Sequence, residues 1–305
     1  MGYFLFHFYI WSDSGPVQIP KGEIISKRWR IIKKLGEGGC GAVYKVENIH
    51  TKQEAALKAE SNFVSGGSVL KLEVQILQRL LNRPYVAQLL HSGKRETYCY
   101  VVMTLLGESL RHITKLVKIA VVSSQVRIGI NILFGLKQIH DIGFIHRDIK
   151  PANMAVGKFG TPEYRFIHIL DFGLAREFVV MSSGGKLKMR RPRARALFRG
   201  TTRYCSIGTH EKSEQGRMDD LWCLLYMLAE LRGPLPWTNR RCGCISYCTS
   251  PSKRIDEWLR SDQLRGPSKN FYSFRLSATT TSFEWFRCGF VCCLRIHHLQ
   301  SLMRW

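Results

Sequence analysis

Residues 36–43 form a turn that is rich in glycine. The segment reads GEGGCGAV and lies between two stretches of strand-like sequence. Glycines allow backbone N–H groups to approach phosphate oxygens closely. A dinucleotide-binding loop would need a helix after the turn, and a P-loop would need Gly-Lys where this chain has Gly41-Ala42. The segment is therefore either a phosphate-binding hairpin or an ordinary tight hairpin.

A lysine and a glutamate further along the chain suit each other as partners. Lys58 ends a strand-like run of small and apolar residues, Ala55–Leu57. Glu73 lies on the apolar face of the next predicted helix, where a carboxylate without a cationic partner costs roughly several kcal/mol. We expect an ion pair between the two, which would aim the ammonium group of Lys58 at phosphates. The alternative is a solvated lysine at the surface.

Two further motifs follow in the chain. Residues His146–Asn153 read HRDIKPAN, and Asp171–Gly173 reads DFG. These match the patterns H-R-D-x4-N and D-F-G. With the glycine-rich turn, Lys58 and Glu73 before them, their order and gaps resemble those of the eukaryotic protein kinases.

The resemblance implies a role for each matching residue. Asp148 would accept the proton of a substrate hydroxyl, and Lys150, a mark of serine/threonine kinases, would offset charge on the moving phosphoryl group. Asn153 and Asp171 would hold magnesium ions. The nucleotide-binding residues implied are Gly36, Gly38, Gly41, Val43, Lys58, Glu73, Met103, Leu105 and Leu106. ATP and Mg²⁺ are the cofactors that this resemblance implies. His146 is expected to brace the loop and not to carry protons.

Other segments resemble the casein kinase 1 group of that family. Leu105–Leu110 (LLGESL) is similar to the group's hinge, with Met103 as gatekeeper and Leu105 or Leu106 bonding adenine through the backbone. Gly200–Ile207 (GTTRYCSI) is similar to the group's G-T-x-R-Y-x-S-I-N, which replaces the usual A-P-E.

The closest resemblance is to tau-tubulin kinase-like members, on Gly216–Trp222 (GRMDDLW) and LPW at 235–237. Asp220 matches the aspartate that ties a buried helix to the catalytic loop.

A run of basic residues lies in the segment that would dock the substrate. Residues 181–203 hold eight Lys and Arg and no Asp or Glu. Arg203 matches the family's anion-binding arginine. Cationic side chains at this place would favour acidic or already phosphorylated protein substrates. The alternative is a solvated basic loop.

The elements that must position these residues follow from periodicity. Strands are expected at residues 29–35, 42–46, 54–58 and 98–103, and helices after Ser68, at 124–140 and at 219–231. Ser68 is expected to cap the first helix, and Gly233-Pro234 to stop the last. The predicted fold class is α+β, a two-lobed kinase fold with a small antiparallel β lobe and a mainly helical lobe.

The predicted boundaries are a poorly ordered leader at 1–28, a kinase domain at 29–239 and a divergent Cys-rich tail at 240–305. Within the domain, the β lobe covers about 29–103 and the helical lobe about 108–239. The tail lacks the marks of further kinase helices, so the helical lobe looks incomplete. Six of the 10 cysteines crowd between 242 and 293, but their spacing is a poor match to zinc ligands.

The net charge and the hydropathy pattern limit the classes of protein to which this chain could belong. Lys and Arg number 46 against 23 Asp and Glu, a net charge of +23 that attracts acidic partners. No apolar run is long enough to span a bilayer, and the start of the chain lacks a signal peptide, so we expect a cytoplasmic protein that also enters the nucleus. We expect the chain to be a monomer. No signature of specific nucleic-acid binding is present. The alternative to an active kinase is an inactive kinase-like scaffold.

Overall fold

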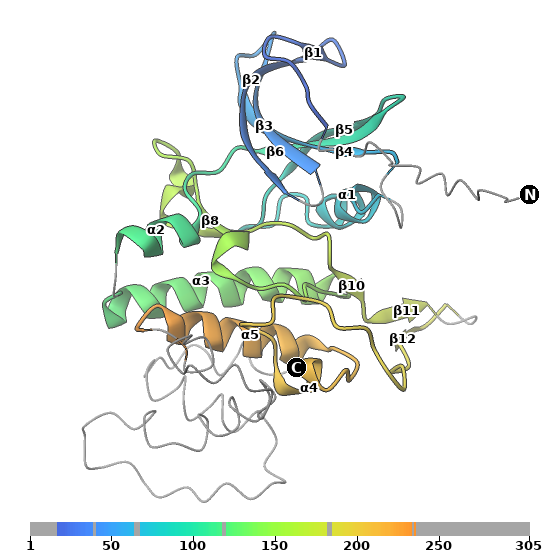
Figure 1. The fold of residues 1–305 in the computed structure, drawn as a ribbon, viewed down its shortest axis with the longest axis vertical. Coiled ribbons are helices and arrows are strands. Elements are labelled where there is room, and N and C mark those ends of the chain that lie inside the picture. Colours follow the sequence, from blue (N-terminus) through green and yellow to red (C-terminus); the bar gives the residue numbers. More distant parts are fainter. Residues whose placement is uncertain are drawn as a thin grey trace, which may run out of the picture. The chain divides into compact units, whose positions relative to one another are not determined.

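The computed structural model describes residues 17–38, 41–63, 68–117, 120–181, 185–233 and 235. The chain divides into two compact units (Figure 1). The first contains residues up to Arg83, Ala87–Leu106 and Asp171–Gly173, and the second contains Pro84–Val86, Gly107–Leu170 and the chain from Leu174 onward.

The first unit is built on an antiparallel sheet of six strands. They are β1 (Ile24–Ile25), β2 (Trp29–Gly38), β3 (Gly41–Asn48), β4 (Glu54–Ser61), β5 (Leu89–Lys94) and β6 (Tyr98–Thr104), in the order β1-β2-β3-β4-β6-β5. Side chains of β3 alternate between buried and half-buried, so one face supplies the core. The strands predicted from alternation are therefore present, and β2 and β3 extend into the glycine-rich turn.

Helix α1 (Leu70–Arg79) belongs to the first unit and buries Glu73 among Leu70, Ile76 and Leu77. Its start differs from the predicted Ser68 cap, because Val69 is the N-cap residue. Ser68 Oγ still accepts from the Leu70 N–H at 3.3 Å, and the buried carboxylate of Glu60 accepts from the same group at 3.2 Å. Glu60, a residue of β4, therefore caps the start of α1 together with Ser68.

Residues 17–28 belong to the leader that was predicted to be poorly ordered, but in the structure they pack against the sheet. β1 pairs with β2, and Ile25 is fully buried. The Ile19 N–H donates to the Tyr44 hydroxyl, which donates in turn to the Val17 carbonyl. Two-residue β1 is too short for an alternating pattern, which is why periodicity missed it. Residues 1–16 lie outside the described residues.

The second unit is mainly helical. Its helices are α2 (Leu110–Leu116), α3 (Val122–Asp141), α4 (Ile207–His210) and α5 (Arg217–Glu230), with 3₁₀ turns η1 (Pro151–Asn153) and η2 (Pro162–Arg165). Three two-stranded ladders join β7 (Phe144–Ile145) to β10 (Arg176–Glu177), β8 (Met154–Val156) to β9 (Ile167–Ile169) and β11 (Val179–Met181) to β12 (Leu187–Met189).

Helices α3 and α5 form the centre of the second unit, side by side in Figure 1. Gln125 Nε2 of α3 donates to the Leu228 carbonyl of α5 at 2.7 Å. No side chain of α5 is exposed, as its nearly continuous apolar sequence predicted. The helix starts two residues before the predicted Asp219, because the Asp219 carboxylate accepts from the Gly216 N–H at 2.6 Å and caps the first turn.

The α+β division into a curled antiparallel sheet and a helical unit confirms the predicted fold class. The tail at 240–305, with its crowded cysteines, lies outside the described residues. Within the described ranges, no helix combines the length and the apolar content that crossing a bilayer requires.

Candidate active site

The glycine-rich turn of the first unit is held by β2 and β3, whose register pairs Gly36 with Val43 and Gly38 with Gly41. Gly41 has φ +133°, and a Cβ there would lie 2.1 Å from the Ala59 carbonyl oxygen, so only glycine fits. A Cβ at Gly36 or Gly38 would meet no atom within 4 Å. The backbone at these two glycines borders open space, as a phosphate cradle requires.

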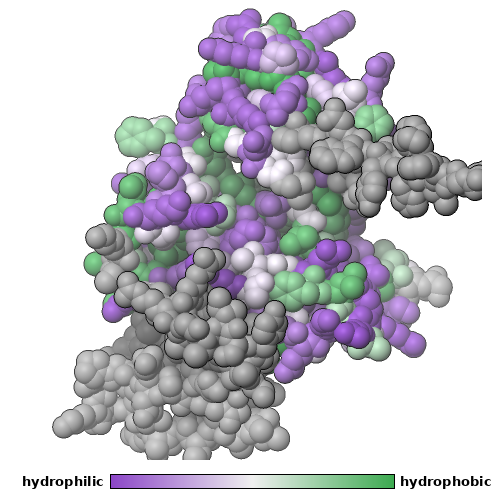
Figure 2. Space-filling view, in the orientation of Figure 1, coloured by the Kyte–Doolittle hydropathy of each residue, from purple (hydrophilic) through white to green (hydrophobic). Residues whose placement is uncertain are grey.

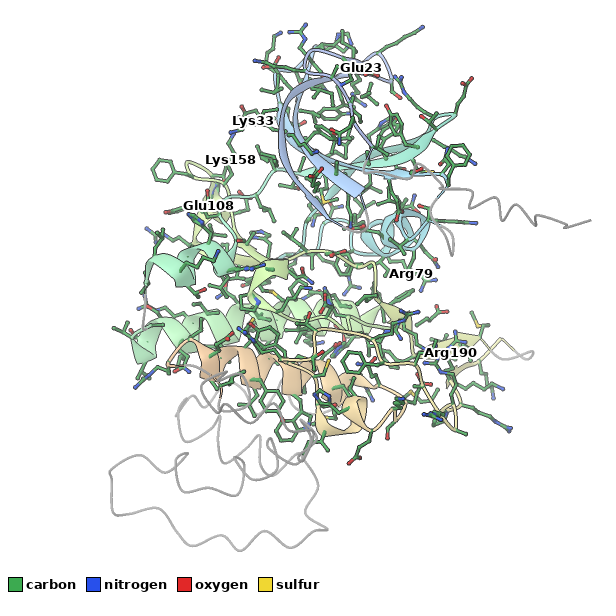
Figure 3. The ribbon with its side chains drawn as sticks, in the orientation of Figure 1. Glu23, Lys33, Arg79, Glu108, Lys158 and Arg190 are labelled. Carbon is green, nitrogen blue, oxygen red and sulfur yellow. The ribbon has the colours of Figure 1, made fainter. Side chains whose placement is uncertain are left out.

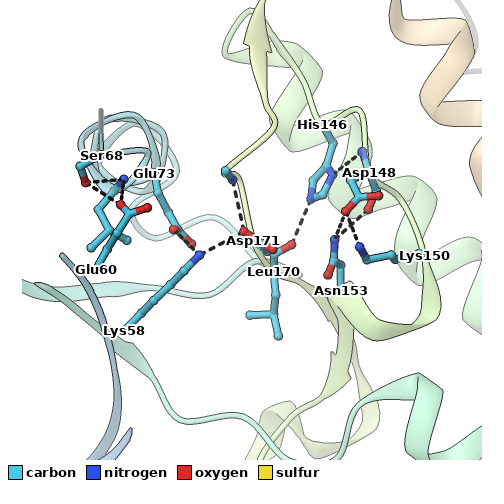
Figure 4. A network of polar contacts seen from close by, with 12 residues as sticks. Lys58, Glu60, Ser68, Glu73, His146, Asp148, Lys150, Asn153, Leu170 and Asp171 are labelled. Atoms are coloured by element: carbon cyan, nitrogen blue, oxygen red, sulfur yellow. Dashed lines mark hydrogen bonds and ion pairs between the residues drawn. The ribbon is translucent and has the colours of Figure 1, made fainter. Parts of the chain in front are cut away.

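Lys58 stands between two carboxylates of the first unit (Figure 4). Its Nζ lies 2.8 Å from Glu73 Oε2 and 3.1 Å from Asp171 Oδ1. Burial alone would lower the pKa of Lys58, but the charges of Glu73 and Asp171 raise it above its ordinary value. The lysine is a fixed cation, and the predicted pairing with Glu73 is confirmed.

Asp171 is the accessible member of this group. The side chain of Asp171 is 46% exposed, whereas that of Glu73 is 2% exposed. Its backbone has φ +63°, a left-handed conformation that few residues other than glycine adopt. The fully buried Phe172 follows it and anchors the segment. A carboxylate held at the surface in this way can meet a cation from solvent.

The residues predicted to contact adenine lie at the end of β6. Met103 is buried and pairs with Ala56 of β4 and Leu89 of β5. Leu105 and Leu106 follow the strand and are half-buried. Within the described part of the chain, their backbone N–H groups have no hydrogen-bond partner. They can therefore bond a ligand, as the hinge prediction requires.

A second polar network lies in the second unit and centres on Asp148 (Figure 4). Lys150 Nζ lies 2.6 Å from Asp148 Oδ2, and Asn153 Nδ2 donates to the carbonyl of Asp148 at 2.9 Å. Thr201 Oγ1 donates to Asp148 Oδ1 at 2.7 Å, and Lys150 donates to Thr201 at 3.2 Å. The structure thus brings the three predicted catalytic residues together.

Thr201 is a member of this network that sequence reasoning missed. It lies in the GTTRYCSI segment, whose resemblance to the casein kinase 1 group assigns no role to this hydroxyl. The sequence signal for this contact is Gly200, which precedes Thr201. Its φ is +115°, and a Cβ at this position would lie 2.6 Å from the Arg147 carbonyl oxygen. Only a glycine lets this segment reach the Asp148 loop.

Asp220 fixes the backbone of the Asp148 loop. Its buried carboxylate accepts from the N–H groups of His146 and Arg147, both at 2.8 Å, and from His140 Nε2 at 2.9 Å. Burial by itself would raise the pKa of Asp220, but the hydrogen bonds that its carboxylate accepts, first the one from His140, lower this pKa overall. The predicted tie between helix and loop is confirmed.

His146 braces the same loop, as expected. Its Nδ1 accepts from the Asp148 N–H at 3.2 Å, so Nε2 carries the proton that is donated to the Leu170 carbonyl at 3.0 Å. The ring is fully buried, and both nitrogens are used.

Arg203, the predicted anion-binding residue, already has a carboxylate beside it. Its NH1 atom lies 2.7 Å from Glu230 Oε1, and the Tyr204 hydroxyl donates to Glu230 Oε2 at 2.5 Å. Burial alone would lower the pKa of Arg203, but the charge of Glu230 raises it. An incoming anion would therefore compete with Glu230.

The donor atoms near these networks suit magnesium. In the second unit, both side-chain hydrogen bonds of Asn153 come from its amide nitrogen and do not use its amide oxygen; in the first unit, Asp171 offers carboxylate oxygens. Oxygen ligands supplied by one or two side chains are what Mg²⁺ prefers in nucleotide sites. Among the described residues no cluster of three or more His, Cys, Asp or Glu could hold a metal by itself.

Comparison with known proteins identifies related chains. Residues 29–264 match the protein kinase domain family, beyond the boundary predicted at 239. A Caenorhabditis elegans protein whose name assigns it to the serine/threonine-protein kinases, K06H7.1, is 52% identical over 74% of this chain and 66% of its own length. The serine/threonine-protein kinase spe-6 of the same organism is 31% identical over 84% of this chain and 67% of its own length.

A third relative carries a different label. The inactive tau-tubulin kinase ttbk-6 of Caenorhabditis elegans is 40% identical over 53% of this chain and 59% of its own length. The chain spans about two thirds or less of the length of these relatives.

Proposed function

Because the chain belongs to the protein kinase family, and within it to the casein kinase 1 group, we propose that it transfers the γ-phosphoryl group of ATP to serine and threonine hydroxyls of proteins. The observation that carries the proposal is the pair of assembled networks, one around Lys58 and one around Asp148.

The hydrogen bonds around Asp148 support its role as a general base, because they hold its carboxylate in one orientation. Phosphoryl transfer has a loose transition state, so catalysis depends mainly on position and charge. Asp148 would accept the proton of the acceptor hydroxyl, and its carboxylate is held by Lys150, Asn153 and Thr201. Lys150 would also offset negative charge on the phosphoryl group in transit.

The Lys58 network supports nucleotide positioning. Lys58, oriented by Glu73, would bind phosphate oxygens next to the open backbone at Gly36 and Gly38. Asp171 and Asn153 would hold magnesium, which neutralises charge on the phosphates when bound.

We also propose a preference for acceptor sites that carry acidic or phosphorylated residues. Its support is the basic segment at 185–203, in which the described residues include no Asp or Glu. Part of this charge is already balanced, because Arg193 pairs with Glu214 and Arg203 with Glu230. The preference should therefore be moderate and should shrink as salt rises.

The second candidate is an inactive kinase-like scaffold. One relative bears the name of an inactive tau-tubulin kinase, which describes that relative. This chain retains Lys58, Asp148, Asn153 and Asp171, and the structure forms their hydrogen bonds, which favours activity.

The deciding experiment is phosphorylation of casein by the full chain with radiolabelled ATP and Mg²⁺. Asp148→Asn is the matched control, because it keeps the shape of the side chain and removes the base. Incorporation by the wild type that disappears in the variant supports the kinase. If both proteins bind Mg·ATP and neither transfers phosphate, the scaffold is correct.

A further inference from the structure

The second unit has a cavity of about 190 Å³ that contains none of the residues proposed for phosphoryl transfer, although the basic segment at 185–203 forms part of its lining. It lies among β7 and β10, the end of β12 and the residues that start α5. Its apolar wall is formed by Ile145, Phe178, Met189 and Pro192. An engineered protein cavity of about 150 Å³ admits benzene. The space therefore suits one aromatic or large aliphatic side chain.

Part of the apolar wall remains in contact with water. Met189 is 59% exposed, although it is a large apolar side chain. The β11–β12 register places Met189 opposite Val179, and Leu187, which is 71% exposed, opposite Met181. Because alternate residues of a strand share a face, these four form an apolar strip that leads from the pocket. A group that covered it would gain hydrophobic free energy.

Arginines surround the cavity, so we call it the arginine-rimmed pocket. Four arginines and two glutamates line it: Arg176, Arg190, Arg191, Arg217, Glu177 and Glu214. Figure 3 labels Arg190 in this region, and Figure 2 shows hydrophilic side chains gathered over it.

Both glutamates are already engaged. Glu214 accepts two hydrogen bonds from the Arg193 side chain, at 2.6 and 3.0 Å, and one from the Arg193 N–H at 3.2 Å, and it pairs with Arg176 at 3.4 Å. Glu177 lies 3.7 Å from Arg190. The rim therefore keeps an excess of positive charge.

Two arginines of the rim are placed to meet a ligand. The guanidinium of Arg217 lies over the Phe178 ring, 5.1 Å from its centre, so an aromatic wall and a cation adjoin. Arg191 is exposed and makes no ion pair within the described part of the chain. The positive electrostatic field extends beyond the rim to Arg147. Burial and the charges of Arg176, Arg193 and Arg199 lower the pKa of Arg147 to about 10.

We propose that the arginine-rimmed pocket is a docking site for a partner protein, and that it receives one aromatic or large apolar side chain flanked by acidic residues. The apolar wall would hold the side chain, and the rim would bind the flanking carboxylates.

The pocket combines an apolar wall with a basic rim. This combination favours an acidic peptide segment with a central apolar residue over other anionic ligands. A free phosphate would meet the arginines but leave the apolar wall uncovered. A bilayer surface needs a broad apolar face, whereas this cavity admits one side chain. An acidic segment with a central apolar residue satisfies both the wall and the rim, which is the charge complementarity expected of a specific interface.

The test is direct binding of fluorescent probe peptides to the full chain, measured by anisotropy without ATP. The three probes are Glu-Glu-Phe-Glu-Glu, Glu-Glu-Ala-Glu-Glu and Gln-Gln-Phe-Gln-Gln. Replacing Phe with Ala should weaken binding about tenfold, because burial of a phenyl ring is lost. Replacing the glutamates should weaken it about fivefold at low salt and less at high salt.

Two variants of exposed residues locate the site. Met189→Ala should reduce the difference between the Phe and Ala probes, and Arg191→Gln should weaken both acidic probes about two- to fivefold. Arg127→Gln on α3 is the matched control, since it removes an exposed arginine away from the pocket lining and should change nothing.

Several results would overturn the docking site. These are no binding of any probe, equal binding of the Phe and Ala probes, or equal effects of Arg191→Gln and Arg127→Gln. Stronger retention on phosphatidylserine vesicles that Met189→Ala abolishes, without peptide binding, would assign the pocket to membranes instead. The measurement involves no phosphoryl transfer, so failure of the proposed kinase activity would leave this result unaffected.

Discussion

The networks around Lys58 and Asp148 are held in place by different means. Lys58 depends on two side-chain carboxylates, one buried at Glu73 and one partly exposed at Asp171. Asp148 sits on a loop whose backbone is fixed by the buried Asp220 and whose carboxylate has three side-chain partners. The Lys58 network is held together by ion pairs, whereas the Asp148 network is held by hydrogen bonds between its loop and the buried Asp220. Substitutions should therefore affect them in different ways.

Asp148→Asn should produce the largest effect. We expect kcat to fall about 10³-fold while the Kd for ATP changes less than about twofold, because the general base touches only the acceptor hydroxyl. Steady-state kinetics and calorimetric titration with Mg·ATP measure the two quantities. Equal losses of binding and turnover would show that Asp148 has a different role.

Lys58→Met should reduce kcat/KM about 10²-fold or more through misplaced phosphates. Because Glu73 is then left buried without its cation, the variant should also be less stable by about 3 kcal/mol. The double variant Lys58→Met/Glu73→Gln should recover most of the stability and none of the activity, as urea unfolding and kinetics would show. Full activity in Lys58→Met would refute the pairing as a functional unit.

Asp220→Ala tests the scaffold of the second network. It leaves two backbone N–H groups and His140 without their acceptor, so we expect a loss of about 3 kcal/mol in urea unfolding. Ser206→Ala removes a hydroxyl bonded to neighbouring Asp219 and is the milder control. A loss in Asp220→Ala no larger than in that control would contradict the scaffold.

The acid side of the stability curve gives a smaller effect. The folded-state pKa of Asp220 is lowered, so its contribution is complete above the unfolded pKa of about 3.9 and is lost as pH falls through the lower folded value. Asp220→Asn should therefore lose less stability than the wild type between pH 4 and pH 2. Parallel curves for the two proteins in that range would contradict the assignment.

Glu230→Gln should produce the smallest effect, in the opposite direction. The amide can still accept from Tyr204 but no longer neutralises Arg203, so kcat/KM for phosphorylated acceptor peptides should rise about two- to fivefold. Peptides without acidic residues should be unaffected. Tyr204→Phe, which keeps the Arg203–Glu230 pair, is the matched control, and a rise in both variants would point to a looser fold.

Sequence reasoning predicted well where a single residue conflicts with its local pattern. Glu73 on an apolar stripe required a cation, and the cation is Lys58. The strands and the three long helices followed from periodicity. The sequence did not indicate how evenly α3 is buried: Ile132, Leu136 and Ile139 are fully buried, whereas Ile130 and Leu133 are only partly so. Gly135 marks a close approach on the buried side of the helix, since a Cβ there would lie 2.8 Å from Ile169 of β9.

By itself the sequence determined the order of the motifs, the α+β pattern and the identity of the groups that could do chemistry, because these depend on residue type and short spacings. Only the tertiary structure decided that Thr201 bonds Asp148, 53 residues away, and that Glu230 occupies Arg203, 27 residues away. It also placed Glu60 of β4 at the start of α1 and arginines from several segments around one apolar pocket. The physical reason is that a hydrogen bond or ion pair depends on which distant segments meet, and no local period records that meeting.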